Sequence, residues 1–331
     1  MAINKNAFLK KNLFSEKASI APTRNGFGEG LLAAGKKNKN IVALCADLCG
    51  STRVKPFAEA FPERFFQVGV AEQNMAAVAS GMAAEGKIPF AASFAMFSPG
   101  RNWEQIRTTI CYNDQNVKII GSHAGISTGP DGATHQALED IAILRAIPNM
   151  EIIVPADAEQ AKNATLAMAK SPVPGYLRLS REKTPEFTSA RTPFAIGKAD
   201  VYWSGKDVTV IACGLPVHDA LVAAKTLGRK ASVEVINCHT VKPLDAATIL
   251  KSVRKTGRVV TVEEHQLAGG MGSAVSELLA RELPAPVEML GIDDKFGESG
   301  SKAELWEQFG LGPDAVINAV LRVMKRKKAK S

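Results

Sequence analysis

Short β-rich segments alternate with helical patterns along almost the whole chain, and this alternation limits the possible folds more than any other feature of the sequence. Such alternation is typical of parallel sheets whose strands are joined by crossover helices. The expected strands are 41–45, 65–70, 89–94, 117–122, 151–154 and 176–179, followed by 208–212, 233–237, 259–262 and 287–292. The expected helices of the second half are 216–226, 244–254, 271–282 and 313–325. The sequence therefore predicts an α/β protein.

One segment interrupts the alternation. Residues 181–200 contain Pro185, Pro193 and Gly197 and show little periodicity, which is typical of a linker. A chain of 331 residues is long enough to form two domains. We expect an N-terminal arm at 1–19, a first domain at 20–190 and a second domain with a basic tail at 191–331.

The charges gather at the two ends of the chain. The formal net charge is +8, but lysines near the N-terminus and five basic residues between 325 and 330 account for it, so the body between them is formally neutral. Charged ends of this kind favour solvated tails over binding arms. We therefore expect no nucleic acid and no membrane as a partner.

The cysteines indicate a reducing compartment. The chain has five, and no two of them have the two-residue gap of a zinc knuckle or a redox motif. The basic N-terminal segment lacks the apolar run of a secretory signal, and no later stretch is long and apolar enough to span a bilayer. These observations predict a cytoplasmic protein.

A single carboxylate leads an apolar helix face in the stretch FFQVGVAEQNMAAVASGMAAEG. Met75, Val78, Ala79 and Met82 share that face at helical spacing, and Glu72 lies one turn earlier on the same face. The helix dipole alone favours a glutamate in the first turn. A parallel sheet, however, binds ligands at the carboxyl ends of its strands, and a carboxyl group walled by apolar side chains there has its charged form disfavoured. Such a group can share a proton near neutral pH.

The segment from Val68 to Asn74, VGVAEQN, resembles the pyrimidine-binding domain of transketolases. In that family the glutamate hydrogen-bonds a ring nitrogen of the aminopyrimidine of thiamine diphosphate and favours the tautomer that deprotonates the thiazolium carbon. The resemblance implies this catalytic and cofactor-binding role for Glu72. It also implies a thiamine-diphosphate-binding fold followed by a transketolase C-terminal-like α/β domain.

Two aromatic residues follow in PFAASFAMFSPGRNWEQIR. Taken alone, Phe94 and Phe97 are typical core residues at a strand end. The resemblance implies that they stack on the pyrimidine ring, a contact worth about 1 kcal/mol beyond the buried area. Gly100 stands where the family often has a third ring. Asp47 ends an expected strand as a turn residue, and the resemblance places it near the cofactor and the subunit interface.

Two histidines and an aspartate lie in the glycine-rich loop GSHAGISTGPDGATHQ. Glycines let such a loop turn tightly around a small ligand. The loop is similar to the transketolase substrate loop, which implies that His123, Asp131 and His135 hydrogen-bond sugar hydroxyl and phosphate groups. It also makes the two histidines candidates for handling hydroxyl protons. Ala124 and Pro130 depart from the family pattern, so the preferred sugar stays open.

Cationic and hydroxyl side chains are needed to bind a sugar phosphate, and arginine suits a phosphate best. Arg24, Ser51 and Arg181 match the phosphate contacts of the family in their order along the chain. Each of them alone is a common surface residue.

In the second domain, Gly269, Gly270 and Gly272 follow a strand and open a helix, as in an anion-binding turn. The spacing lacks the full dinucleotide motif. The resemblance implies instead a domain that is structural and builds a dimer. His265 would then lie at a subunit interface or would only have its hydrogen bonds satisfied within the domain.

The sequence has no Gly-Asp-Gly motif, which thiamine-diphosphate enzymes use to hold Mg²⁺ and the diphosphate. The resemblance covers roughly residues 20–325 but only the last two of the three transketolase domains. It implies a separate N-terminal subunit that brings the diphosphate and Mg²⁺, no metal ligand in this chain, and an α2β2 assembly around a dimer core.

The implied reaction is the reversible transfer of a two-carbon ketol unit from a ketose phosphate to an aldose phosphate. Deoxyxylulose-phosphate synthase and the β subunit of a 2-oxoacid dehydrogenase share the fold and stay open as alternatives. The first normally carries all three domains on one chain, and the second usually lacks a loop of the GPDGATHQ type. A non-catalytic binding subunit is a further alternative, against which the presence of Glu72, Phe94 and His135 argues.

Overall fold

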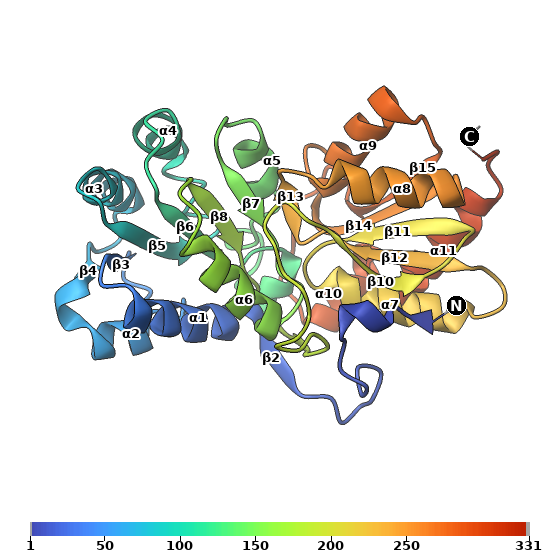
Figure 1. Ribbon diagram of the computed structural model, residues 1–331, viewed down its shortest axis with the longest axis horizontal. Coiled ribbons are helices and arrows are strands. Elements are labelled where there is room, and N and C mark those ends of the chain that lie inside the picture. Colours follow the sequence, from blue (N-terminus) through green and yellow to red (C-terminus); the bar gives the residue numbers. More distant parts are fainter. Residues whose placement is uncertain (1, 329–331) are drawn as a thin grey trace.

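The computed structural model describes residues 2–328. Lys330, the last residue of the predicted basic tail, lies outside the described residues. Two sheets stand side by side, and helices cover both faces of each (Figure 1). The predicted α/β architecture is therefore confirmed.

The first sheet has the strand order β13-β7-β8-β6-β5-β3-β4. Its strands are β3 (Ile41–Cys45), β4 (Phe65–Gln67), β5 (Ile88–Phe94), β6 (Lys118–Ser122), β7 (Glu151–Ile153), β8 (Gly175–Arg178) and β13 (Thr240–Lys242). All pair in parallel except β13, which is antiparallel to β7. The chain passes from β3 to β4 on one side and then to β5 on the other. This reversal next to β3 is where open parallel sheets bind ligands, at the carboxyl ends of the strands.

Helices lie on both faces of the first sheet (Figure 1). One face carries α1 (Thr23–Lys37), α2 (Lys55–Ala60) and α6 (Ala158–Met168), and the other carries α3 (Glu72–Ala84), α4 (Trp103–Gln105), the π-helical η3 (Ile106–Cys111) and α5 (Asp140–Arg145). The short 3-10 helices are η1 (Lys5–Ala7), η2 (Pro62–Arg64) and η4 (Ile126–Asp131). Helix α1 packs closely on α6 because Gly26 has no side chain: a Cβ there would lie 1.7 Å from the carbonyl oxygen of Ala158.

The second sheet has the order β1-β10-β12-β11-β14-β15. Its strands are β1 (Ala2–Ile3), β10 (Asp200–Ser204), β11 (Val208–Ala212), β12 (Val233–Asn237), β14 (Val259–Gln266) and β15 (Val287–Ile292). Its helices are α7 (Pro216–Leu227), α8 (Ala246–Thr256), α9 (Met271–Glu282), α10 (Lys302–Gln308) and α11 (Pro313–Met324). The predicted strands are present, whereas the antiparallel β10 and the short α10 were not predicted.

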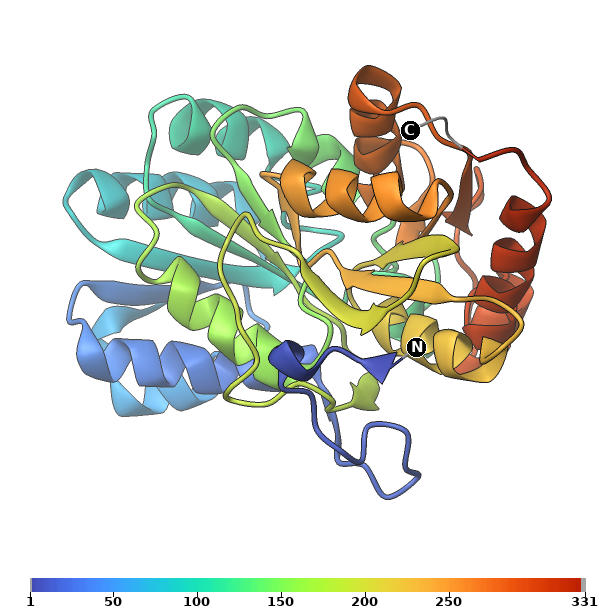
Figure 2. The same cartoon turned by 45° about the vertical axis from the view of Figure 1, so that its right-hand side comes forward.

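Each sheet contains one edge strand that comes from the half of the chain that forms the other sheet. The N-terminal arm contributes β1, which pairs with β10 of the second sheet, and Leu13 of the arm is 1% exposed (Figure 2). In return, β13 leaves the second half and pairs with β7. The prediction of a solvated basic N-terminal tail is therefore wrong: the arm is docked, although its lysines Lys5, Lys11 and Lys17 remain exposed.

The predicted linker is also more ordered than expected. It contains β9 (Lys183–Pro185), which pairs with β2 (Ile20–Pro22), and Phe187 is fully buried. The largest apolar cluster continues from Ile119 and Ile152 in the first part to Ile211 and Ile236 in the second. Because close-packed interiors resist deformation, this shared core fixes the two halves relative to each other. None of the helices between residues 2 and 328 combines the length and apolarity needed to cross a membrane.

Candidate active site

Glu72 is the first residue of α3 and its side chain is 1% exposed. Its Oε2 lies 2.6 Å from Nη1 of Arg101, and Ser93 Oγ donates a hydrogen bond of 3.3 Å to its Oε1. Asn102 donates to the backbone carbonyl of Glu72 and anchors the start of the helix. The predicted burial is confirmed. The prediction of purely apolar surroundings is wrong, because Arg101 balances the carboxylate charge.

Two aromatic rings lie next to this ion pair. Phe94 ends β5, and the ring of Phe97 stacks beside it with centroids 6.3 Å apart. The Arg101 guanidinium lies 5.0 Å from the centroid of Phe97, so it bridges the aromatic pair and Glu72. A Cβ on Gly100 would lie 2.0 Å from the carbonyl oxygen of Met96. The tight turn therefore excludes a third ring at this position.

Both histidines of the glycine-rich loop reach the aromatic pair. The His123 ring stacks on Phe94 with centroids 3.8 Å apart. His135 meets Phe94 and Phe97 edge-on, at 6.2 and 5.4 Å between centroids. The structure thus brings the two phenylalanines of one segment against the two histidines of another.

The hydrogen bonds of His123 define its protonation. Nε2 lies 3.1 Å from Nη1 of Arg24, and Nδ1 lies 2.9 Å from the hydroxyl of Ser122. A guanidinium can only donate, so Nε2 accepts and the ring is neutral with its proton on Nδ1. Burial, reinforced by Arg24 and Arg181, lowers the pKa of His123 to about 3. His123 is therefore neutral throughout the physiological pH range.

The low pKa of His123 predicts a pH-dependent stability. Unfolding returns the ring to its ordinary pKa of about 6.5, so between about pH 3 and 6.5 the unfolded chain binds more protons than the folded chain. The free energy of unfolding should then fall as the pH decreases from 6.5, by up to about 1 kcal/mol per pH unit from this residue.

The measurement is urea unfolding of the wild-type chain and of His123→Gln at several pH values from 7 to 5. We expect a smaller pH dependence for the variant. It should not vanish, because burial also lowers the pKa of His265 to about 4. Equal pH dependence of the two proteins would contradict the prediction.

The predicted phosphate contacts form two groups. Arg24, in the first turn of α1, also donates to the backbone carbonyl of Ser51 at 2.9 Å and so joins Ser51 to His123. Arg181 instead pairs with Asp131 at 2.8 Å and donates to the carbonyl of Thr128. Asp131 and Arg181, which were both expected to contact the substrate, thus form an ion pair with each other.

Asp47 lies apart from these groups. It follows β3 at the same edge of the sheet, is exposed, and its backbone N–H donates to Oε1 of Gln67 at 2.7 Å. Asp47, Arg53 and His123 all have φ near +60°. Left-handed backbone in non-glycine residues is uncommon and clusters at functional sites. All three residues follow strands of the first sheet at its carboxyl edge.

Sequence reasoning missed two arginines. Arg101 lies inside the segment that was singled out for its phenylalanines, but nothing in that segment indicates that its side chain reaches Glu72. Arg53 lies two residues after Ser51, and its Nε donates to Oδ1 of Asn25 at 2.9 Å. Only the fold, which brings this loop against α1, distinguishes Arg53 from an ordinary surface arginine.

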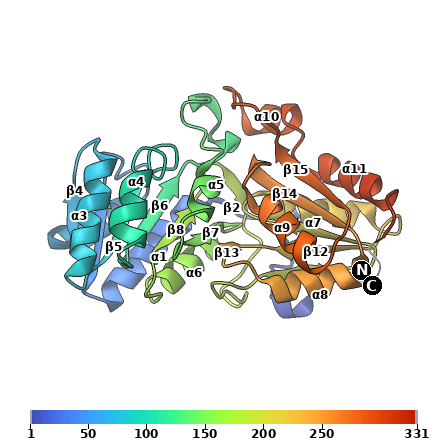
Figure 3. The ribbon, with the colours of Figure 1, turned by 90° about the horizontal axis from the view of Figure 1, so that it is seen from above.

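The second half of the chain holds the glycine-rich loop in place. Gln136 Nε2 donates to the carbonyl of Glu298 at 2.8 Å and to that of Gly129 at 3.2 Å. Oε1 of Glu264, at the end of β14, accepts the N–H of Ser127. Figure 3 shows α10 beside this loop, and η4 contacts α10. The second half of the chain therefore fixes the position of this loop, a role beyond the expected dimer building.

A buried polar network crosses the boundary between the halves. Arg178 of β8 donates to Asp140 at 2.8 Å and to the carbonyl of Glu264 at 2.9 Å, and the Tyr176 hydroxyl donates to Asp140 at 2.7 Å. His265, fully buried, lies with Nε2 3.9 Å from the same carboxylate. Burial opposes ionisation of Asp140, but Arg178 and His265 hold its pKa below the usual value.

The glycine turn at the start of α9 is already occupied by a carboxyl group of the chain itself. The N–H groups of Met271 and Gly272 donate to the Glu263 carboxylate at 2.6 and 2.7 Å. A Cβ on Gly270 would lie 2.3 Å from that carboxylate, which explains the glycine. Burial raises the pKa of Glu263 to about 7. The turn is therefore filled by the chain's own side chain, which leaves no room there for an external anion.

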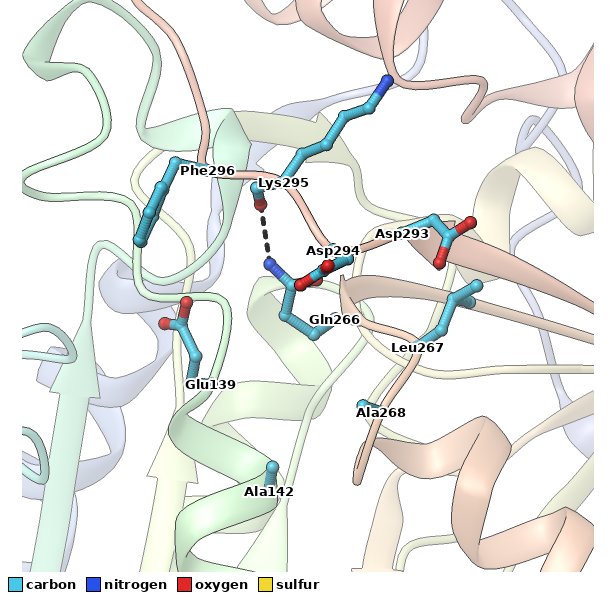
Figure 4. Close-up of a pocket in the computed structure, with 9 residues that line it drawn as sticks. All are labelled: Glu139, Ala142, Gln266, Leu267, Ala268, Asp293, Asp294, Lys295 and Phe296. Carbon is cyan, nitrogen blue, oxygen red and sulfur yellow. Dashed lines mark hydrogen bonds between the residues drawn. The ribbon is translucent and has the colours of Figure 1, made fainter.

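A cavity of about 400 Å³ also lies at the boundary between the halves. Figure 4 shows its lining: Glu139, Ala142, Gln266, Leu267, Ala268, Asp293, Asp294, Lys295 and Phe296. None of the predicted site residues lines it. Its three carboxylates outnumber its one lysine, Lys295, and this negative charge disfavours a sugar phosphate.

The fold and the site define a protein built from the last two domains of a transketolase-type enzyme. Residues 20–186 match the family model of the transketolase pyrimidine-binding domain, and residues 197–316 match that of the transketolase C-terminal domain. The chain belongs to the transketolase family.

Several relatives span nearly the same length. A putative transketolase C-terminal section from Methanocaldococcus jannaschii is 45% identical over 92% of this chain and 96% of its own. A 6-deoxy-6-sulfo-D-fructose transketolase subunit from a Clostridium species is 41% identical over 92% of this chain and 95% of its own. A solved structure described as a split gene transketolase, an inactive beta4 tetramer, is 45% identical with a TM-score of 0.87 and covers 93% of this chain and 99% of that one. Transketolase from Campylobacter jejuni matches 96% of this chain with 48% of its own, at 25% identity and a TM-score of 0.78.

Proposed function

We propose that this chain is the C-terminal subunit of a two-subunit transketolase, which moves a two-carbon ketol unit reversibly between sugar phosphates. The observation that carries the proposal is the buried carboxylate of Glu72 at the carboxyl edge of a parallel sheet, next to Phe97 and Phe94. The family membership supports the same reading.

The residues around Glu72 fit the aminopyrimidine ring of thiamine diphosphate. A carboxylate suits a ring N–H, and stacked phenylalanines suit the flat faces of the ring. Bound thiamine diphosphate would supply the carbon nucleophile that takes up the two-carbon unit. Glu72 would hold the proton of the ring nitrogen, and Asp47 would lie near the cofactor at the subunit boundary.

An N-terminal subunit would bring Mg²⁺ and the diphosphate. The sequence lacks the Gly-Asp-Gly motif with which thiamine-diphosphate enzymes hold Mg²⁺ and the diphosphate. Val70 and Met96, 71% and 37% exposed, flank Glu72 and Phe94 in the sequence and offer an apolar surface that the partner would cover. We propose an α2β2 assembly, in which residues 20–190 supply the pyrimidine site and residues 191–331 steady the substrate loop.

The substrate would lie between the histidines and the arginines. Neutral His123 would accept a hydrogen bond from a sugar hydroxyl group at Nε2, in exchange for its bond to Arg24. Proton transfer would fall to His135. Arg24, Ser51 and Arg181 would hold the phosphate, and Asp131 would exchange part of its contact with Arg181 for a sugar hydroxyl. The five free thiols support a cytoplasmic setting.

The experiment combines this chain with its N-terminal partner, thiamine diphosphate and Mg²⁺. With ribose 5-phosphate and xylulose 5-phosphate, we expect sedoheptulose 7-phosphate from the mixture and from neither subunit alone. Turnover of pyruvate in place of the sugar phosphates would favour the synthase-like or dehydrogenase-like alternatives. A complex that binds the cofactor without any turnover would favour a non-catalytic subunit.

A sulfonated ketose is a second candidate substrate class. It is favoured by the 41% identity to a 6-deoxy-6-sulfo-D-fructose transketolase subunit. The same assay with 6-deoxy-6-sulfofructose as the donor tests it.

A further inference from the structure

Two arginines of the candidate site have no acidic partner within residues 2–328. Arg181 pairs with Asp131, whereas the ion pairs of the described residues include neither Arg24 nor Arg53. Arg24 is half-buried, and its Nε is buried without a hydrogen-bond partner. Unbalanced like charges that lie together are unfavourable, which points to an anion that binds between them.

The chain holds Arg53 firmly beside Arg24. Its φ of +66° is a left-handed conformation that is unfavourable for an arginine. A Cβ on Gly28 would lie 2.7 Å from the carbonyl oxygen of Arg53, so the Arg53 backbone rests directly on α1. The Nε bond to Asn25 anchors the exposed Arg53 side chain on the first turn of α1, the turn that also carries Arg24. Among the described residues, the terminal nitrogens of Arg53 make no hydrogen bond and so remain available to a ligand.

The charge of Arg53 affects the pKa of two other residues of the site. Together with burial and Arg181, it lowers the pKa of Arg24, and it is among the charges that lower the pKa of His123. A site with three guanidinium groups and one carboxylate carries a surplus of two positive charges. A phosphate monoester carries close to two negative charges at neutral pH, whereas a sulfonate carries one.

We propose that Arg53 is a specificity-determining residue that makes this site prefer a sugar with a dianionic phosphate end over one with a monoanionic sulfonate end. The inference rests on the proposed function and extends it to the choice of substrate class. Arg53 provides the second positive charge for the second negative charge of the phosphate, and its planar fork can bind two phosphate oxygens at once. The sulfonate gains less from this residue because it lacks the second charge.

The test compares fructose 6-phosphate with 6-deoxy-6-sulfofructose as donors for the assembled enzyme. For Arg53→Gln we expect the KM for the phosphate donor to rise about tenfold, which corresponds to about 1.4 kcal/mol. The KM for the sulfonate donor should change less than threefold and kcat less than twofold. Arg53→Lys, which keeps the charge without the fork, should recover part of the loss. Arg254→Gln removes an equal charge from the exposed face of α8 and should change neither KM.

A binding measurement separates this inference from the proposed function. Inorganic phosphate is titrated calorimetrically into the isolated chain and into Arg53→Gln, and we expect about tenfold weaker binding by the variant. If the assembled wild-type enzyme converts no ketose, the proposed function fails, yet this titration still tests Arg53. Unchanged phosphate affinity and KM, or an equal loss for phosphate and sulfonate, would overturn the inference.

Discussion

Ketol transfer by the assembled enzyme falls by about a thousandfold when Glu72 is replaced by alanine, because a positioned acid or base typically contributes a hundredfold to ten-thousandfold. Glu72 is the buried carboxylate beside the aromatic pair, and alanine can neither accept nor hold a proton there. The loss should appear in kcat. The KM for the sugar phosphates should change little, since Arg24 and Arg181 are unaltered.

The measurement is steady-state kinetics of the two-subunit mixture, with Glu72→Gln as the closest variant in shape. Glutamine keeps the size of the side chain and its contact with Ser93 but cannot ionise, so it should be nearly as inactive as alanine. Gln73→Ala, at the exposed neighbouring position, is the matched control and should keep normal activity. The variants should fold, because the Arg101 side chain is 45% exposed and can be hydrated once its partner is gone. Activity of Glu72→Gln within tenfold of wild type would refute the role of this carboxylate.

The second large effect concerns stability. Replacing Asp140 by asparagine should lower the free energy of unfolding by about 3 to 5 kcal/mol, the usual loss when one member of a buried ion pair is removed. Arg178 is 6% exposed, so its charge would remain buried without a carboxylate. The pKa of Asp140 is held below its ordinary value, so this stabilisation is present at neutral pH. It is lost only as the pH falls through that lowered pKa.

Urea unfolding of the isolated chain at pH 7 measures this effect. The control is Asp131→Asn, which removes a carboxylate from a pair whose side chains are 37% and 33% exposed, and solvent screening should limit the change to less than about 1 kcal/mol. Equal effects of the two substitutions would show that the network is no more important than a surface pair.

Much of the fold could be predicted from the sequence because buried parallel strands are short apolar runs. β3 and β11 lie where such runs occur. β4 is shorter than predicted because Gly69, with φ of +73°, turns the chain toward α3. β10 was missed because only Tyr202 in this strand is buried, and because the strand starts at Asp200, the last residue of the segment that resembles a linker.

The candidate site was predicted where a local motif carries the information. Glu72, Phe94 and His123 lie in distinctive segments and come together as expected. The importance of Arg101 and Arg53 could not be predicted because it depends on contacts with distant parts of the chain. Arg101 reaches Glu72, and the loop that carries Arg53 rests on α1. The exchange of β1 and β13 depends on tertiary contacts alone, and a pair of two- or three-residue strands leaves no periodic pattern to find.

The exchange of edge strands limits how this protein can be cut and recombined. A break within residues 181–200 would produce two fragments, one lacking the strand that borders β7 and the other lacking the strand that borders β10. Each fragment would expose unpaired backbone N–H and C=O groups along a sheet edge that has lost its edge strand, and such edges promote aggregation. A chimera with a related protein should therefore take residues 240–242 together with the first sheet and residues 2–3 together with the second.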